Sequence, residues 1–342
     1  MFIENLSGRG VERPSWAEPK PLSCEGAGGI PAEAAQNDPI RIMAGETGSI
    51  QGPGEAKWGY TSPTVCDWDG DGLPDVLVNS VWGYVYWHRN VGTRTAPRLG
   101  GAQPIEVEWE GEQPLLPFEF HHEPVGKGLL TQWRTTPATV DLNGDGLPDL
   151  VMLDTMGYLA YFERAVDANG KRILKAPRRM LMNADTNEPL FFSLAGGGKP
   201  FVHGKSRMGA SGRRKFCFVD WDGDGKLDIV VNEGIYHQGS SVALWRQTGK
   251  LGGRWYFTCE GPMSKTPVEG HSCAPAAVDF NGDGVPDLLV GGEDGCFYYQ
   301  RNPRMPSRPA TLFINEDPGV FFNRLHNPSI TDRDGLVREL EE

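Results

Sequence analysis

The chain has 342 residues, of which 39% are hydrophobic and 23% charged, and its formal net charge at pH 7 is −12. This composition is typical of a globular protein with a sizeable core, and no apolar run reaches the roughly 18 residues that a transmembrane helix needs. No basic motif of a known nucleic-acid-binding type occurs, so nucleic acid is not an expected partner.

Residues 1–38 are rich in Pro, Gly and Ala and poor in large aliphatic side chains. This composition predicts an extended N-terminal arm or linker. The first residues, MFIENLSGRGVERP, lack the basic and apolar regions of a signal peptide.

The first motif with clear chemistry is DWDGDGLPDVLVN, which begins at Asp67. It has Asp at alternate positions, as an EF-hand loop does, but Val78 stands where an EF-hand has its closing glutamate. Hard cations such as Ca²⁺ take several oxygen ligands, and carboxylates at alternate positions of a tight loop can converge on one ion. Glycines at the fourth and sixth positions permit the sharp turns that this convergence requires.

The same loop occurs at residues 67–75, 141–149, 220–228 and 279–287. Positions 1, 5 and 9 are always Asp, position 3 is Asp or Asn, and positions 4 and 6 are always Gly. We expect the ninth-position Asp to replace the missing glutamate as the closing ligand, and the variable seventh residue to offer its backbone carbonyl. The sequence thus predicts about four calcium ions, with side-chain ligands Asp67, Asp69, Asp71, Asp75, Asp141, Asn143, Asp145, Asp149, Asp220, Asp222, Asp224, Asp228, Asp279, Asn281, Asp283 and Asp287.

Each loop lies between a short entering strand and a β-rich apolar run, and an aromatic third strand follows. Helical periodicity is absent on both sides, which argues against a pair of EF-hand helices. Short antiparallel strands repeated at intervals of this size predict an all-β fold, a β-propeller built of four explicit blades and five to seven in total. The repeats are expected over residues 39–305, with a degenerate blade or closing segment over 306–342.

The pattern D-x-[DN]-G-D-G-x-x-D between two short strands resembles the FG-GAP/VCBS repeat of integrin α-chain propellers and of bacterial surface and polysaccharide-degrading proteins. The resemblance covers roughly residues 58–302. It implies a calcium-stabilised propeller, but it indicates no single activity, because one fold hosts many functions.

Aligning the four repeats on their first aspartate places certain upstream residues at equivalent positions. Seven residues before that aspartate lie Tyr60, Arg134, Arg213 and Ser272, and eight before it lie Gly59, Trp133, Gly212 and His271. Equivalent strand ends of a propeller meet on one face, so we expect Tyr60, Trp133, Arg134, Arg213, Arg214 and His271 to gather there. Arg forks bind carboxylates or sulfates and aromatic faces pack on sugar rings, which indicates an anionic sugar. The alternative is that these residues are solvated strand ends or pair with nearby acids.

Long insertions supply further candidates on loops, where function commonly resides. One carries His121 and His122, and another carries Tyr236 and His237. The expected substrate-binding residues are therefore Trp133, Arg134, Arg213, Arg214 and Tyr236.

Two functions remain open from the sequence. The first is an enzyme on an acidic, uronic-acid polysaccharide, acting as a lyase by β-elimination, in which a cation neutralises the uronate and a base removes its α-proton. Its candidate catalytic residues are His271, His122, His237, Tyr60 and Arg134. The second is a non-catalytic adhesion or interaction propeller that binds a cell-surface glycan or a protein. Either function fits an extracellular, periplasmic or cell-surface location, where calcium is plentiful.

The six cysteines show no zinc spacing, and Cys66, Cys217 and Cys273 lie on entering strands. Small buried thiols are the favoured interpretation, and a disulfide pair is the alternative.

Overall fold

The structure is a computed structural model, and it describes residues 2–7, 15–26, 35–37, 39–46, 48–49, 52–111, 126–129, 131, 133–192, 213–233, 241–264, 268, 272–304 and 312–314. Within these ranges the regular elements are β-strands and one short 3₁₀ turn. No helix among them has the length and apolarity to cross a membrane.

The chain divides into two compact units that each contain two of the aspartate loops. One unit comprises Met1, Pro21–Arg213 and Leu251–Arg254, and the other comprises Phe2–Lys20, Arg214–Lys250 and Trp255–Glu342.

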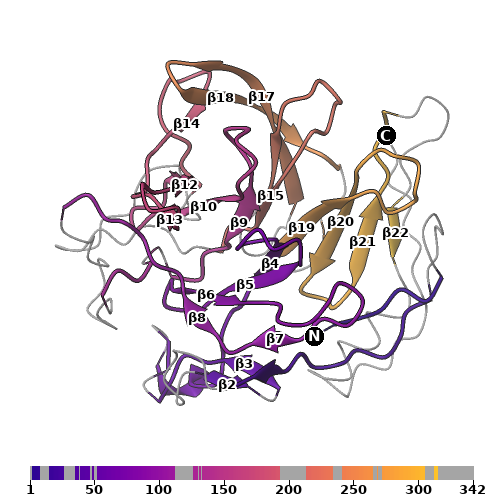
Figure 1. Cartoon of the computed structure of the whole chain (residues 1–342). Coiled ribbons are helices and arrows are strands. Elements are labelled where there is room, and N and C mark those ends of the chain that lie inside the picture. Colours follow the sequence, from indigo (N-terminus) through magenta and orange to yellow (C-terminus); the bar gives the residue numbers. More distant parts are fainter. Residues whose placement is uncertain are drawn as a thin grey trace. The chain divides into compact units, whose positions relative to one another are not determined.

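The first sheet of the first unit contains β4 (Pro63–Cys66), β5 (Asp75–Asn79), β6 (Val85–His88) and β8 (Gln103–Pro104). Its strands are antiparallel and lie side by side in this order (Figure 1). The first aspartate loop is the connection between β4 and β5. The ninth-position Asp75 is the first residue of β5 and pairs with Cys66, the last residue of β4.

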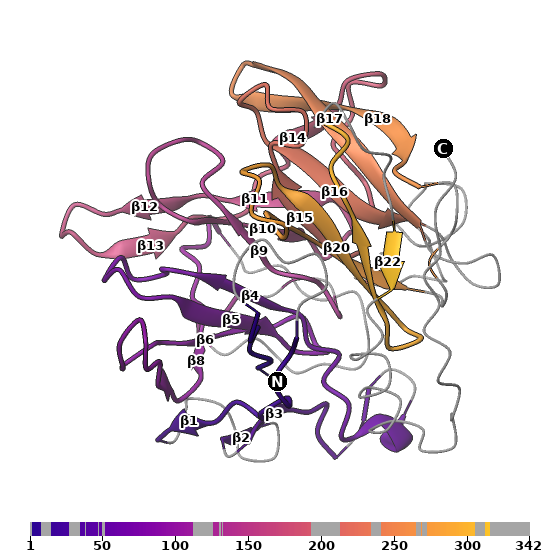
Figure 2. The ribbon, with the colours of Figure 1, turned by 90° about the vertical axis from the view of Figure 1, so that its right-hand side faces the viewer.

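The second sheet repeats this plan with β9 (Ala138–Val140), β10 (Asp149–Leu153) and β11 (Leu159–Phe162). Every residue of β10 is buried, because this central strand is covered on both faces. The hairpin of β12 (Arg164–Val166) and β13 (Arg172–Leu174) continues from β11 and extends beyond the sheet (Figure 2). β14 (Leu181–Asn183) follows it in the chain.

The segment that precedes the first repeat also contains strands. β1 (Cys24–Glu25) pairs in parallel with β7 (Leu99–Gly100), and β2 (Ala35–Asn37) forms a hairpin with β3 (Ile40–Ile42). Part of the predicted N-terminal arm is therefore paired into sheets. The 3₁₀ turn η1 (Pro53–Glu55) lies between β3 and β4.

The second unit has the same plan. One sheet orders β15 (Phe216–Val219), β16 (Asp228–Glu233), β17 (Ser241–Leu251) and β18 (Arg254–Pro262) from one edge. The other orders β19 (Cys273–Val278), β20 (Asp287–Gly292), β21 (Phe297–Gln300) and β22 (Leu312–Ile314), as Figure 1 shows.

Each unit has its own hydrophobic core between its two sheets. In the first unit Trp68 and Leu77 of one sheet pack with Leu150 and Phe162 of the other. In the second unit the cluster includes Trp221 from one loop and Leu288 from β20. Burial of these side chains is the main force that joins neighbouring sheets.

The predicted all-β class and the repeated antiparallel sheets are confirmed. The arrangement of the sheets as blades of a ring stays a prediction, as does the division into residues 1–38, 39–305 and 306–342. Of the three cysteines on entering strands, Cys273 is buried, whereas Cys66 and Cys217 are half-buried, so the interpretation as buried thiols holds fully for Cys273 alone.

Candidate metal loops and a buried arginine cluster

The first aspartate of each loop organises the backbone of that loop. In the second, third and fourth loops its Oδ1 accepts a hydrogen bond from the fourth-position glycine N–H at 2.7–2.8 Å. Its Oδ2 accepts the sixth-position glycine N–H at 2.8–3.1 Å, and Asp67 makes this second bond to Gly72 at 2.9 Å. All eight glycines have φ between 71° and 87°, a region that side chains disfavour. The two invariant glycines are therefore required by backbone conformation.

The third and fifth positions form successive Asx turns. The fifth-position Asp accepts the seventh residue's N–H at 2.9 Å in every loop. The third-position Asp or Asn accepts the fifth residue's N–H at 2.9–3.3 Å. These local bonds turn the side chains of positions 1, 3 and 5 toward the same side of the loop.

Carboxylate oxygens gather as a result. Oxygens of Asp67, Asp69 and Asp71 lie within 4.8 Å of one another, and so do those of Asp220, Asp222 and Asp224. Asp67 Oδ1 is buried and has no hydrogen-bond partner. A buried oxygen without a donor is costly, and a hard cation bound by oxygens would satisfy it. The residues present therefore fit a hard divalent metal ion.

The ninth-position aspartates have a second task that their spacing does not reveal. Asp75, Asp149, Asp228 and Asp287 are all 0% exposed. Asp149 shows the pattern: Oδ2 accepts the Leu142 N–H at 3.1 Å and the Tyr161 hydroxyl at 3.0 Å, and Oδ1 accepts the Arg164 N–H at 2.8 Å. Each of these aspartates thus ties its loop to the third strand of its own sheet or to the residues directly after that strand.

Burial raises the pKa of all four of these carboxyl groups, and it raises that of Asp228 to about 6. The backbone donors oppose this rise without cancelling it. Each carboxylate oxygen has two lone pairs, so the hydrogen bonds leave acceptor capacity for a metal ion. Their role as closing ligands stays a prediction.

The residue that donates its N–H to Oδ1 of the ninth-position Asp is called the anchor residue here. The four anchor residues are Asn90, Arg164, Gln247 and Asn302. The side chains of two anchor residues also contact the aspartate loop of the repeat before their own. Arg164 donates to the Trp68 carbonyl at 3.1 Å, with its guanidinium 3.7 Å from the Trp68 ring centroid, and Asn302 donates to the Trp221 carbonyl at 2.9 Å. Within each unit, one anchor residue therefore joins two successive aspartate loops.

An arginine directly before the anchor residue balances the charge of three loops. Arg89 pairs with Asp69 at 2.5 Å and Asp71 at 3.0 Å, Arg246 with Asp222 at 3.3 Å, and Arg301 with Asp283 at 3.0 Å. In the second repeat the equivalent residue is Glu163, which pairs with Lys175 at 2.7 Å and with Arg178. The hydrogen bond from the Leu73 N–H, aided by Arg89, lowers the pKa of Asp71.

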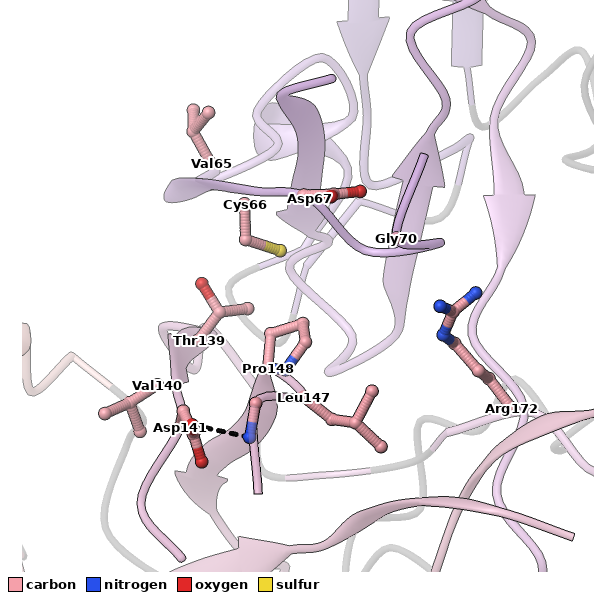
Figure 3. A pocket seen from close by; sticks show the side chains of 11 residues that line it. Val65, Cys66, Asp67, Gly70, Thr139, Val140, Asp141, Leu147, Pro148 and Arg172 are labelled. Carbon is pink, nitrogen blue, oxygen red and sulfur yellow. Dashed lines mark hydrogen bonds between the residues drawn. The ribbon is translucent and has the colours of Figure 1, made fainter. Parts of the chain in front are cut away.

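A cavity of about 350 Å³ lies between the first and second loops. Figure 3 shows the Cys66 thiol and Asp67 on one wall, Thr139, Leu147 and Pro148 on the other, and the Arg172 guanidinium turned toward Gly70. Arg172 donates to the Asp69 carbonyl, and a Cβ at Gly70 would lie 2.2 Å from the guanidinium. Burial raises the pKa of Cys66 to about 12, so its thiol is not a nucleophile at neutral pH.

The repeat alignment predicts that Tyr60, Trp133 and Arg134 meet, and the structure brings these three side chains into contact. The Arg134 guanidinium lies 3.5 Å from the Tyr60 ring centroid and 4.4 Å from the Trp133 ring centroid. Arg134 is 3% exposed and pairs with Glu55 at 3.2 Å. Glu55 also accepts hydrogen bonds from the Tyr60 hydroxyl at 2.5 Å and from Ser49. We call Ser49, Glu55, Tyr60, Trp133 and Arg134 the arginine cluster.

The electrostatics of the arginine cluster follow from burial and pairing. Burial alone would raise the pKa of Glu55, but hydrogen bonds from Ser49 and Tyr60 and the charges of Arg134 and Arg213 outweigh it, so that pKa is lowered. Burial and the bond to Glu55 raise the pKa of Tyr60 to about 12. At neutral pH the cluster therefore contains an ionised Glu55, a neutral Tyr60 and a charged Arg134.

The remaining predicted residues are placed as follows. Arg213 and Arg214 are half-buried, and Arg214 donates to the Asn232 carbonyl at 2.5 Å. His122, Tyr236, His237 and His271 lie outside the described residues. The alignment missed Ser49 and Glu55, because they precede the first repeat and have no equivalent in the others.

A comparison with known protein families identifies the repeat that contains the third and fourth aspartate loops. Residues 212–290, which contain the third and fourth loops, match the family model of the FG-GAP-like repeat. The chain contains an FG-GAP-like repeat. The first and second loops have the same spacing of Asp and Gly as this matched stretch, and the second loop also has the same hydrogen bonds from its glycines to its first aspartate.

No curated protein matches the chain. A solved structure of an Agrocybe aegerita lectin, studied for its specific recognition of non-reducing terminal N-acetylglucosamine, is similar at 16% identity with a TM-score of 0.38. The alignment covers 88% of this chain and 58% of the lectin chain, so the chain spans less than two thirds of that protein. A likeness this distant bears on neither fold nor function.

Proposed function

We propose that the chain is a calcium-stabilised propeller that binds an acidic, uronic-acid polysaccharide. The observation that carries the calcium assignment is the loop frame, which recurs four times and leaves Asp67 Oδ1 buried without a donor. Oxygen-only donors suit Ca²⁺, which accepts varied coordination geometries, whereas Mg²⁺ demands stricter octahedral geometry.

Each ion would be held by the carboxylates or amide oxygens at positions 1, 3, 5 and 9, with the carbonyl of position 7. Calcium supplies positive charge at the centre of the loop, which relieves the repulsion among these oxygens. The chain's own contribution is the backbone frame, because the hydrogen bonds described above hold the ligands in place before an ion arrives.

The acidic-glycan proposal is supported by the charge of the arginine cluster. Arg134 and Arg213 both act on Glu55, so two guanidinium groups face one carboxylate among these residues. Guanidinium groups beside aromatic rings suit a carboxylate-bearing sugar. Because Arg134 is buried and paired with Glu55, it serves such a ligand as support for the surface.

The alternatives are a lyase and a non-catalytic adhesion or protein-interaction propeller. Tyr60 with a pKa of about 12 remains protonated at neutral pH, which suits a proton donor better than a general base. This observation argues against Tyr60 as the base of a β-elimination. Calcium loops of this kind also favour a location outside the cytoplasm, where calcium is abundant.

The test is to incubate the calcium-loaded protein with alginate, polygalacturonate and hyaluronan, with dextran as the uncharged control. Binding is followed by calorimetry, and elimination by the ultraviolet absorbance of the unsaturated uronate. Binding to an acidic polymer without new absorbance supports the proposal. New absorbance would establish the lyase instead, and no binding to any acidic polymer would refute the glycan assignment.

A further inference from the structure

Trp58 differs from every other tryptophan of the chain. All ten tryptophans lie within the described residues. Trp58 is the only exposed one, with 54% of its surface accessible to solvent. The others are buried or half-buried, among them Trp68 in the core and Trp133 in the arginine cluster. An exposed aromatic side chain offers a large apolar contact area at a low cost in conformational entropy, which suits a binding platform.

A backbone hydrogen bond and a contact with one neighbouring ring fix the position of Trp58. The Trp58 N–H donates to the Glu55 carbonyl at 2.9 Å, directly after the 3₁₀ turn η1. Its ring meets the Tyr60 ring edge to face, with centroids 5.7 Å apart. Tyr60 in turn lies on Arg134, so Trp58 is the outermost member of a stack that continues through Arg134 to Trp133.

The backbone that positions this stack adopts conformations that are disfavoured for these residues. Tyr60 has φ 48° and Arg134 has φ 60°, and they are two of the three non-glycine residues with positive φ in the described part of the chain. A Cβ at Gly59 would lie 2.1 Å from the Ile42 carbonyl oxygen, so only glycine fits between Trp58 and Tyr60. Strain of this kind persists only where surrounding contacts enforce it, and it is concentrated at binding sites.

The immediate surroundings of Trp58 favour a sugar over a protein partner. Between Gly52 and Pro63 the exposed residues besides Trp58 are Pro53, Gly54, Lys57, Thr61 and Pro63, and the next exposed large apolar side chain along the chain is Val65. A protein interface has an apolar core of several residues, whereas one pyranose ring presents a C–H face of about the area of one indole. Lys57 and the nearby arginines add positive charge for a carboxylate on that sugar.

We propose that Trp58 is the stacking platform for a pyranose ring of the glycan, an assignment that rests on the proposed function. The ring lies on the free face of the indole, and its carboxylate points toward the positive charge of Lys57 and the arginine cluster. Tyr60 and Arg134 act as positioning residues, because they support the platform from positions that are half-buried and buried, respectively.

The experiment measures binding of the polymer that the wild type prefers in the panel above. Trp58→Ala should weaken binding at least about tenfold, which corresponds to about 1.4 kcal/mol. Trp58→Phe should recover part of this loss. Phe2→Ala is the matched control, because Phe2 is also an exposed aromatic residue with 54% of its surface accessible.

A second readout uses the wild-type fold alone. Trp58 should dominate acrylamide quenching of tryptophan fluorescence, and the bound polymer should protect it. If the wild type binds and neither its quenching nor its affinity depends on Trp58, the platform is refuted while the glycan function stands. If the wild type binds no acidic polymer, the glycan function fails and the platform falls with it.

Discussion

The aspartates of each loop have structural roles that depend on their position in the loop. The aspartates at positions 1, 3 and 5 are exposed or half-buried and shape the loop, whereas the one at position 9 is buried and serves as an internal acceptor. A loop of this kind is thus a structural connection as well as the proposed cation site. The position-9 residue should matter even when calcium is absent.

Asp149→Asn tests that duty. The amide would turn an NH₂ group toward buried donors that include Leu142 N–H, Arg164 N–H and the Tyr161 hydroxyl. Each donor left unsatisfied costs about 1–3 kcal/mol, so chemical denaturation in EDTA should show a loss of at least that size. Asp185→Asn, at an exposed site, should change stability by less than about 0.5 kcal/mol. Equal effects of the two substitutions would contradict the structural role.

Glu55 gives a second prediction at this scale, through pH. Its folded pKa is lowered, so its stabilising contribution is present above the unfolded value of 4.5 and is lost as pH falls through the folded value. Glu55→Gln should lower stability at neutral pH by about 3–5 kcal/mol, because it leaves the Arg134 charge buried without a carboxylate. It should also flatten the acid limb of the stability curve. Glu188→Gln, an exposed glutamate, should leave that limb unchanged.

At the scale of strands and loops, some features can be predicted from the sequence and others cannot. The spacing of Asp and Gly predicts the hairpins correctly, because backbone conformation demands those residues at those places. The alignment also predicts that Tyr60, Trp133 and Arg134 meet. It could not predict Glu55, which is 79 residues from its partner Arg134 and belongs to no repeat. The joint role of Arg164 and Asn302 is equally hidden, because different residue types make the same bond.

Arg164→Met tests the connection between neighbouring sheets of the first unit. The variant keeps an apolar stem over Trp68 but removes the donor to its carbonyl, a charged hydrogen bond worth about 1.5–3 kcal/mol. Hydrogen exchange at the amides of residues 68–75 should accelerate although the substitution lies in the next repeat. Arg178→Met, which removes an exposed ion pair with Glu163, is the control. Unchanged exchange in the first loop would show that packing alone joins the sheets.

At the scale of the whole molecule, four like-charged loops make stability depend on cation supply. Chelation should lower the melting temperature, and calcium should restore it, because each site stabilises by about 2.7 kcal/mol when calcium exceeds its dissociation constant a hundredfold. Magnesium at equal concentration should restore less. A melting curve that does not change between EDTA and calcium would contradict the metal assignment.

The bonds from Arg164 and Asn302 to the loop before them also have a consequence for dissecting the chain. A single repeat excised from its neighbour would lose the donor to a tryptophan carbonyl and uncover one face of its sheet. The smallest fragment that folds by itself should therefore be a tandem pair, such as the stretch from β4 through β13. Truncations intended for expression should be cut between pairs and not between individual repeats.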